Sequence, residues 1–187
     1  QAEALGLGHA VLCARPVVGD EPFAVILADD LIQGEGQGVI AQMVEVYERF
    51  GCSVLGVEEV PRQETNKYGI VATETGPDGE LRVTSMVEKP APEDAPSNLA
   101  VVGRYILTPR IFDKLVETQV GAGGEIQLTD GIAALLAEEP VIAYPFKGKR
   151  YDCGSKLGYL EAQVELALQH PELGEDFAAY LKALAVE

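Results

Sequence analysis

The fold class is decided by the stretch Pro22-Phe23-Ala24-Val25-Ile26-Leu27-Ala28-Asp29-Asp30. Positions 23–28 are apolar without interruption, which predicts a strand buried on both faces. Apolar residues then recur at helical spacing between Ile40 and Tyr47, and the β-branched segment 52–57 predicts another strand. This strand–helix–strand alternation indicates an α/β layer with a parallel sheet.

The remainder of the chain continues the mixture of strands and helices. Gly76-Pro77-Asp78-Gly79 separates two strand-like segments and predicts a hairpin. The expected segments are strands at 69–73, 81–88, 100–107 and 141–146, and helices at 8–14, 109–116 and 126–137. From Ser155 an apolar stripe at helical spacing runs to Pro171, and a last amphipathic helix covers 173–184. No repeat or domain linker is visible, so the sequence predicts one domain over 1–187 with a C-terminal helical segment at 155–187.

Composition limits what the chain binds. Thirty acidic against fourteen basic residues give a formal charge of −16. That charge argues against nucleic acid and anionic membranes as partners, because phosphate-rich surfaces attract clustered Lys and Arg. The longest apolar runs are strand-sized, and nothing resembles a signal peptide. Cys13, Cys52 and Cys153 are scattered and odd in number, which predicts reduced thiols in a cytoplasmic protein.

Two aspartates stand where a ligand could reach them. Asp29 follows the first apolar strand, and open α/β folds bind ligands at the carboxyl ends of such strands. A carboxylate there could hold a magnesium ion that bridges phosphates, but Asp29 or Asp30 could also cap or turn a loop. Asp152 precedes a glycine turn that opens a helix, and the residues alone slightly favour a helix N-cap at this position.

Glu88 and Lys89 lie at the end of an expected strand, ahead of Pro90. Consecutive strand residues face opposite ways, so both side chains reach one ligand only if the strand ends or twists there. The proline makes such an end plausible. A carboxylate can bind sugar hydroxyls and an ammonium can bind a phosphate, whereas the structural alternative is a surface ion pair of little energetic value.

Four motifs taken together carry a resemblance to a known family. They are Gly6-Leu7-Gly8-His9-Ala10-Val11, the stretch 24–30, Val87-Glu88-Lys89-Pro90, and Asp152-Cys153-Gly154-Ser155-Lys156-Leu157-Gly158-Tyr159. In this order the chain closely resembles the bacterial UTP–glucose-1-phosphate uridylyltransferases, a family within the sugar nucleotidylyltransferases. The resemblance covers positions 1 to about 174. It implies a Rossmann-like nucleotidyltransferase fold, a mixed sheet flanked by helices with further helices at the C-terminus.

The resemblance also implies roles for single residues. Asp29 and Asp152 correspond to the two Mg²⁺ ligands, with Asp30 as the runner-up to Asp29, and Lys89 corresponds to the lysine that holds the sugar phosphate. These three are the expected catalytic residues. The expected substrate-binding residues are Lys89 again, Glu88 at the sugar hydroxyls, Gly69 and Gly103 beside the sugar, and Gln1 and Gly8 at the uracil base.

The implied reaction is transfer of a uridylyl group from UTP to glucose 1-phosphate, giving UDP-glucose and pyrophosphate. A thymidylyltransferase is a close rival, and a nucleotide-sugar glycosyltransferase is a third enzyme class, although only Asp29-Asp30 occurs where it would normally show D-x-D. Neither the family's G-x-G-T-R loop nor its P-K-E-M-L stretch is present. We therefore expect the C-terminal two-thirds of such an enzyme, inactive alone, and a non-catalytic fragment or assembly module is the rival of another class. The apolar stripes of the C-terminal helices predict a homo-oligomer.

Overall fold

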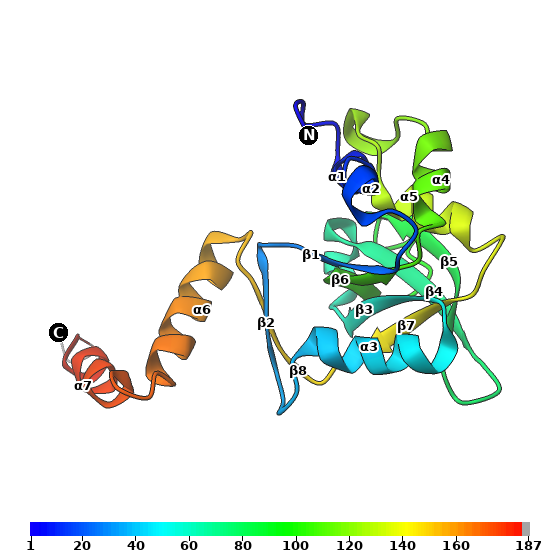
Figure 1. Cartoon of the computed structure of the whole chain (residues 1–187). Coiled ribbons are helices and arrows are strands. Elements are labelled where there is room, and N and C mark those ends of the chain that lie inside the picture. Colours follow the sequence, from blue (N-terminus) through cyan, green and yellow to red (C-terminus); the bar gives the residue numbers. More distant parts are fainter. Residues whose placement is uncertain (185–187) are drawn as a thin grey trace.

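A mixed β-sheet forms the centre of the computed structural model, which describes residues 1–184 without the side chain of Ala122 (Figure 1). Positions 185–187, the end of the helical segment expected at 155–187, lie outside the described residues. Within residues 1–184 this sheet has six strands in the order β1-β6-β3-β7-β5-β4. Their bounds are β1 (Phe23–Ile26), β3 (Ser53–Glu59), β4 (Gly69–Thr75), β5 (Leu81–Glu88), β6 (Leu99–Leu107) and β7 (Val141–Pro145). The expected mixed sheet is confirmed.

Strand β1 differs from the expectation that opened the sequence analysis. It lies at an edge of the sheet, antiparallel to β6, and its exposure alternates along the strand, with Ile26 58% exposed. The expectation of a strand buried on both faces is therefore wrong. β1 and β3 run in the same direction, but β6 lies between them and is antiparallel to both. The one parallel pairing among the described strands joins β3 to β7, so a purely parallel layer is also wrong.

Helices cover both faces of the sheet (Figure 1). Helix α3 (Val39–Phe50) packs on one face, where Met43 meets Val54 of β3 and Ile106 of β6. The opposite face packs against three helices: α1 (Leu7–Leu12), α4 (Ile111–Glu117) and α5 (Leu128–Leu135). Neighbouring residues such as Val54 and Leu55 thus enter different clusters, as the two-residue period of a strand requires. Helix α3 ends at Gly51, whose φ of 65° gives the left-handed conformation common at helix C-termini.

The expected hairpin is the part of the sheet that reaches the functional residues. β4 and β5 pair antiparallel across the turn at 76–79, from Thr75 opposite Leu81 to Gly69 opposite Glu88. The start of β5 pairs with β7, whereas the start of β4 pairs with β6. Three short elements lie outside the expected set: α2 (Arg15–Val18) and the 3₁₀ helices η1 (Arg62–Lys67) and η2 (Ala122–Gly124).

A second, two-stranded sheet has no counterpart in the sequence analysis. It consists of β2 (Asp30–Gly34) and β8 (Gly148–Asp152), which pair antiparallel and are called the ribbon below. Its strands read DLIQG and GKRYD, and neither shows the apolar alternation that marks a half-buried strand. The ribbon places Asp30 directly opposite Asp152.

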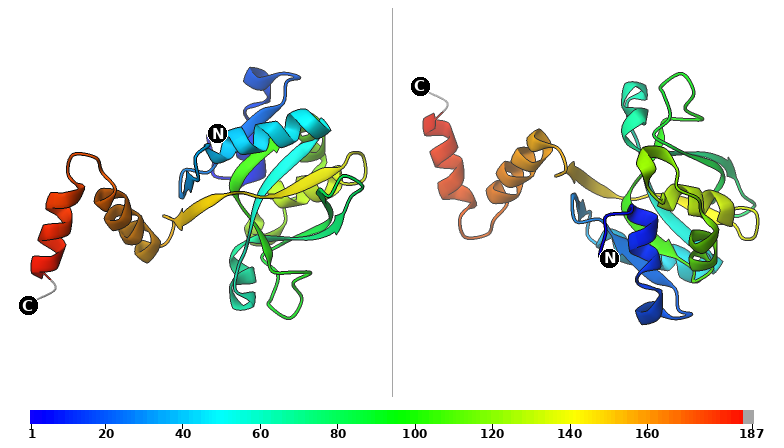
Figure 2. Two further views of the ribbon diagram at one scale, coloured as in Figure 1. Left: turned by 90° about the horizontal axis from the view of Figure 1, so that it is seen from below. Right: turned by 90° about the horizontal axis from the view of Figure 1, so that it is seen from above.

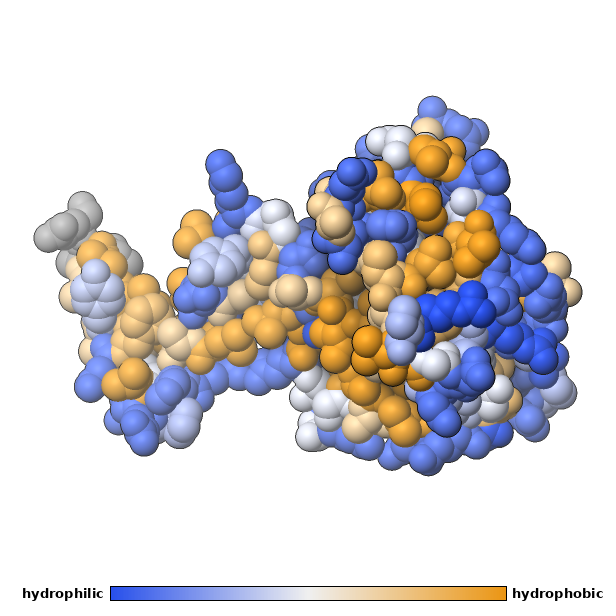
Figure 3. Space-filling model, turned by 45° about the horizontal axis from the view of Figure 1, so that its top comes forward, coloured by the Kyte–Doolittle hydropathy of each residue, from blue (hydrophilic) through white to orange (hydrophobic). Residues whose placement is uncertain are grey.

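The C-terminal helices α6 (Lys156–Leu168) and α7 (Gly174–Leu184) form an arm that projects from the body of the molecule (Figures 1 and 2). Their apolar stripes are present as expected, yet they are exposed, with Leu157 67% and Leu160 59% accessible. Figure 3 shows apolar side chains gathered along this arm. In residues 1–184, no helix combines the length and the apolar character needed to cross a membrane.

Candidate functional site

A cavity of about 330 Å³ opens where the ribbon, the β4–β5 hairpin and the start of α5 meet. Its described lining contains six of the eight residues that the sequence singled out, which lie up to 123 positions apart in the chain. They are Asp29, Gly69, Glu88, Lys89, Gly103 and Asp152. The fold therefore gathers residues from β4, β5, β6 and the ribbon around one space.

Asp29 and Asp152 are neighbours at the end of the ribbon. The register pairs Asp30 with Asp152, and the N–H of Cys153 donates to the carbonyl oxygen of Asp29 at 2.7 Å. A Cβ atom placed on Gly154 would lie 3.1 Å from Oδ1 of Asp152 and 3.3 Å from Oδ2 of Asp29. Both carboxylates thus border the same small volume, as two ligands of one ion must.

Helix α6 does not use Asp152 as its N-cap. Ser155 is the N-cap, and its hydroxyl oxygen accepts a hydrogen bond from the N–H of Gly158 at 3.0 Å. Oδ1 of Asp152 instead accepts from the N–H of Gly154 at 3.1 Å, inside the turn before the helix. The capping interpretation that the residues alone favoured is therefore wrong, and the Asp152 carboxylate borders the cavity.

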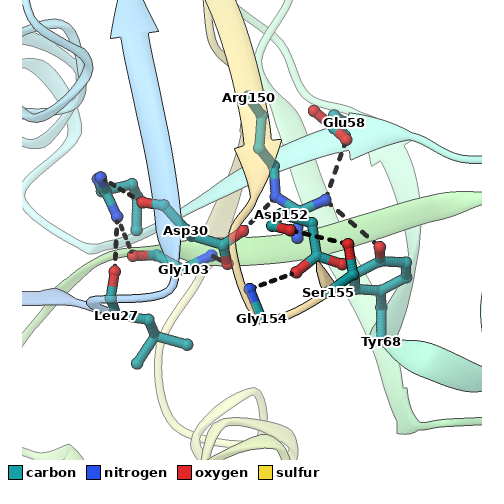
Figure 4. Close-up of polar contacts among 10 residues, drawn as sticks. Leu27, Asp30, Glu58, Tyr68, Gly103, Arg150, Asp152, Gly154 and Ser155 are labelled. Carbon is teal, nitrogen blue, oxygen red and sulfur yellow. Dashed lines mark hydrogen bonds and ion pairs between the residues drawn. The ribbon is translucent and has the colours of Figure 1, made fainter. Parts of the chain in front are cut away.

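Asp30 has a different environment from Asp29, although the two are adjacent (Figure 4). Oδ2 of Asp30 accepts from the N–H of Gly103 at 2.8 Å, and Oδ1 accepts from Nε of Arg150. Asp30 is buried, whereas Asp29 is exposed. Both oxygens of Asp30 are thus used within the protein, which favours Asp29 as the ligand for an ion.

Glu88 and Lys89 face the same cavity because β5 ends between them. Lys89 has a φ of 44°, the one positive value among the described non-glycine residues, and this turns its side chain out of the strand alternation. Lys89 Nζ lies 3.5 Å from Oε1 of Glu88. The sequence analysis required the strand to end or twist ahead of Pro90, and β5 does end at Glu88. A strained backbone at a cavity is typical of a functional position.

Other residues at this cavity were missed by the sequence analysis. Thr129 of α5 donates its hydroxyl to Oε2 of Glu88 at 2.5 Å and so fixes that carboxylate. Arg150 lies over the ring of Tyr68 at 5.0 Å and donates to its hydroxyl at 3.4 Å. Lys67 also lines the cavity. Two of these had a signal in the sequence, since Thr129 lies in the stretch 124–130 that starts a helix and Arg150 lies two residues before Asp152.

The described cavity lining does not include Gln1 or Gly8. Gln1 is exposed, and its side-chain amide donates to the carbonyl oxygen of Gly6 at 3.1 Å. A Cβ on Gly8 would lie 2.7 Å from the carbonyl oxygen of Ile126, so the glycine allows α1 to pack against the segment before α5. The role at the uracil base that the resemblance implies for Gln1 and Gly8 stays a prediction.

Gly103 lines the cavity and packs closely against Asp30 and Leu27. A Cβ at this position would lie 2.6 Å from Oδ2 of Asp30 and 2.7 Å from Cβ of Leu27. The space left by the missing side chain is thus filled by Asp30 and Leu27, and the role beside the sugar that the resemblance implies for Gly103 stays a prediction. Gly103 therefore leaves room for the Asp30 carboxylate, which accepts a hydrogen bond from its N–H.

Replacing Gly103 with alanine should lower the free energy of unfolding by about 2–4 kcal/mol, because the new methyl group displaces a buried, hydrogen-bonded carboxylate. Gly38→Ala is the matched control, since Gly38 has a φ of −61° and no described atom within 4 Å of its added Cβ. We expect the control to cost less than about 1 kcal/mol. Denaturant titration of both variants measures the difference, and equal losses would contradict this role of Gly103.

The cavity is acidic. Its described lining holds five carboxylates, from Asp29, Asp30, Glu88, Glu125 and Asp152, against three cations, from Lys67, Lys89 and Arg150. Burial raises the pKa of the Tyr105 phenol in this wall, and the carboxylates of Glu88, Asp30 and Asp29 raise this pKa further. An anionic ligand would therefore need a cation beside Asp29 and Asp152.

The donor set fits a magnesium ion that arrives with its ligand. Among the described residues, no group of three or more His, Cys, Asp or Glu side chains is arranged to hold a metal. Two adjacent carboxylates nevertheless suit Mg²⁺, which is commonly held by one or two carboxylates together with phosphate oxygens and water. Asp29 and Asp152 are the residues that would hold it.

Comparison with known proteins gives one family and a set of similar enzymes. The family model described as nucleotidyl transferase matches residues 1–169. The chain is 58% identical over 163 residues to a UTP–glucose-1-phosphate uridylyltransferase of Pseudomonas aeruginosa, covering 87% of this chain and 58% of the relative. It is 50% identical over 184 residues to the enzyme of that name from Bacillus subtilis, covering 98% of this chain and 63% of the relative. The chain thus spans about three-fifths of the length of these curated relatives.

Solved structures agree with this grouping. A UDP-glucose pyrophosphorylase complexed with UDP-glucose matches with a TM-score of 0.87 and 48% identity, over 91% of this chain and 65% of that one. A UTP-bound enzyme of the same kind from Acinetobacter baumannii matches with a TM-score of 0.85 and 44% identity, over 96% and 62% of the two chains. A glucose-1-phosphate thymidylyltransferase from Bacillus anthracis, described as putative, shares the fold at 21% identity, with a TM-score of 0.70 over 87% of this chain and 61% of that one.

Proposed function

Because this chain belongs to the nucleotidyl transferase family, we propose that it forms the sugar-binding and metal-binding part of an enzyme that makes UDP-glucose from UTP and glucose 1-phosphate. The observation that carries the proposal is the cavity itself. Asp29 and Asp152 lie together at its ribbon side, and Glu88 and Lys89 face it from the end of β5. The paired carboxylates suit a metal ion, and the Glu88–Lys89 pair suits a sugar phosphate.

In the proposed reaction, a phosphate oxygen of glucose 1-phosphate attacks the α-phosphorus of UTP in line. A new P–O bond forms, the bond to the β-phosphate breaks, and pyrophosphate leaves. Lys89 would hold the sugar phosphate as a point charge, while Glu88, fixed by Thr129, would accept hydrogen bonds from sugar hydroxyls. Bound Mg²⁺ would supply charge stabilisation at the phosphates, and the chain's part is to present Asp29 and Asp152 to it.

The uridylyl enzyme is preferred to a thymidylyl enzyme. The relatives with 50–58% identity carry the uridylyl name, whereas the thymidylyl neighbour at 21% identity supports the fold alone. A titration of the ¹⁵N-labelled chain with UDP-glucose and Mg²⁺ tests the proposal. We expect the amides of Gly69, Glu88 and Lys89 to shift, and dTDP-glucose to bind more weakly. A set of shifting amides that excludes the cavity would refute the proposal.

We also propose that the protein is a homo-oligomer that joins through the C-terminal arm. The arm exposes apolar residues on both of its helices and between them: Leu157, Leu160, Val164 and Leu168 on α6, Leu173 directly before α7, and Tyr180 and Leu184 on α7. Exposed apolar surface of this extent is typical of a protein interface. The cytoplasmic location expected from the sequence stays a prediction, in keeping with the three free cysteines described.

Light scattering at micromolar concentration should therefore give a mass that is a multiple of the 20.0 kDa chain. Leu160→Glu should lower this mass to that of the monomer, because it places a charge in the apolar surface. Gln163→Glu adds the same charge at another exposed position of α6 and should leave the oligomer intact. A monomeric mass for the unaltered chain would contradict the proposal, and so would dissociation by both variants.

A further inference from the structure

The ribbon contains Asp152 and begins directly after Asp29, and it pairs with no strand of the main sheet among residues 1–184. Glu88, in contrast, is the last residue of β5 in the main sheet, and Lys89 follows it. Other contacts must therefore set the position of the carboxylates relative to the sugar-phosphate residues. The far end of the ribbon is held by Gln42 of α3, whose amide donates to the carbonyl oxygen of Lys147 and accepts from its N–H, both at 2.9 Å. A separate set of contacts holds the end at the cavity.

At the cavity end, Asp30 and Arg150 connect the ribbon to β6, to β3 and to the residue before β4 (Figure 4). The Asp30 carboxylate accepts from the N–H of Gly103 on β6 and from Nε of Arg150. Nη1 of Arg150 continues the connection to Oε1 of Glu58 on β3 at 3.3 Å and to the hydroxyl of Tyr68, ahead of β4, at 3.4 Å. The two side chains of the ion pair are only 10% and 7% exposed.

This network also reaches the other side of the cavity. The carbonyl oxygen of Tyr68 accepts from the N–H of Lys89 at 2.9 Å. A continuous series of contacts thus runs from the ribbon through Arg150 and Tyr68 to the backbone of Lys89. These contacts connect the ribbon end beside Asp29 and Asp152 to the residue that carries the lysine side chain.

The Asp30–Arg150 ion pair also reduces the repulsion between carboxylates on the ribbon. Asp30 and Asp152 are directly opposite in the register, so their side chains share one face, and like charges at such positions repel. Arg150 lies two residues before Asp152 and therefore on the same face. By pairing with Asp30, it compensates one carboxylate and leaves the charge of Asp152, and that of Asp29, for a cation.

We propose that Asp30 and Arg150 are positioning residues, which act together as a clamp that holds Asp29 and Asp152 in the geometry of a shared divalent ion. The proposal rests on the proposed function, because it needs the ion to bind at those two carboxylates. Neither clamp residue is a ligand of the ion. Residues that orient metal ligands in this way commonly change metal affinity ten- to a hundredfold when they are replaced.

The test measures Mn²⁺ binding by water-proton relaxation in the presence of saturating UDP-glucose. Arg150→Met removes the charge at similar length, and Arg150→Lys keeps the charge but not the planar fork that bonds Asp30 and Tyr68 together. Gln42→Met is the matched control, because Gln42 is a buried polar residue that holds the other end of the same ribbon. The exchange rate of the Cys153 amide is measured as well, since this N–H donates to Asp29.

We expect Arg150→Met to weaken Mn²⁺ binding about ten- to a hundredfold, Arg150→Lys to weaken it less, and both to speed exchange of the Cys153 amide. Gln42→Met should stay within about threefold of the unaltered chain in both measurements, since it acts at the far end of the ribbon. Equal losses in Gln42→Met and Arg150→Met would overturn the clamp. If Arg150→Met does not fold, Arg150→Lys is compared with Gln42→Met in the same two measurements, and equal losses in these two variants would overturn the clamp. An unaltered chain that binds no Mn²⁺ with UDP-glucose would instead overturn the proposed function, and the clamp with it.

Discussion

Asp29→Asn and Asp152→Asn should each reduce formation of UDP-glucose by at least about a hundredfold, measured in an active polypeptide that carries this sequence. Asparagine keeps the shape of each side chain but removes its charge. Because both carboxylates border one small volume, the loss of either should empty the same ion site. The double variant should then cost far less than the product of the two single losses, since residues that act on one ion are not additive.

The matching control is Asp113→Asn, which removes a carboxylate that pairs with Arg15 away from the cavity. Exposed pairs of this kind contribute about 0–1 kcal/mol, so turnover and the unfolding midpoint should hardly change. Fully multiplicative losses in the Asp29 and Asp152 double variant would contradict the shared site. Loss of folding in either single variant would show a structural role instead.

Lys89→Met should weaken binding of glucose 1-phosphate about ten- to a hundredfold, because it removes a charge-assisted hydrogen bond of roughly 1.5–3 kcal/mol. The same variant should weaken the binding of UTP less than it weakens the binding of glucose 1-phosphate. Lys67→Met is the matched control, since Lys67 lines the same cavity but pairs with Glu64 at 3.3 Å. Calorimetric titration with both ligands gives the comparison. Equal losses at Lys67 and Lys89, or equal losses for both ligands, would argue that Lys89 serves only as the ion-pair partner of Glu88.

Local patterns predicted the elements of the main sheet well. The bounds of β5 match the expected 81–88, and the hairpin at 76–79 forms as the turn residues indicate. The place of β1 could not be predicted in this way, because an apolar run does not show how many neighbours the strand will have. β1 has one described neighbour, β6, and so remains half exposed.

The ribbon was missed for a different reason. Its strands are short, polar and far apart in the sequence, so their pairing follows from tertiary structure rather than from local pattern. Because the pairing of β2 with β8 was not predicted, the different environments of Asp29 and Asp30 could not be predicted either. The resemblance selected Asp29 over Asp30, and the structure supplies a physical reason, because Asp30 is buried in hydrogen bonds with Gly103 and Arg150.

The sequence predicted the backbone conformation at Lys89 only indirectly, as a requirement for binding one ligand through Glu88 and Lys89. The sequence required an end of the strand at Pro90 if Glu88 and Lys89 were to face one ligand, and the φ of 44° at Lys89 meets that requirement. Local sequence does not encode such a value, since an L-residue rarely adopts it without tertiary support. Thr129, which fixes Glu88, comes from α5 and depends on how that helix packs against β5.

The central claim, a divalent ion shared by Asp29 and Asp152 beside the bound nucleotide sugar, is tested most directly by crystals grown with UDP-glucose and Mn²⁺. Anomalous scattering at the manganese edge locates the ion independently of any assumption about its ligands. We predict one peak in the cavity, within about 2.3 Å of a carboxylate oxygen of each aspartate, with the remaining ligands from phosphate and water. A peak bound by Asp30 or Glu125 instead, or none in crystals that contain UDP-glucose, would contradict the account.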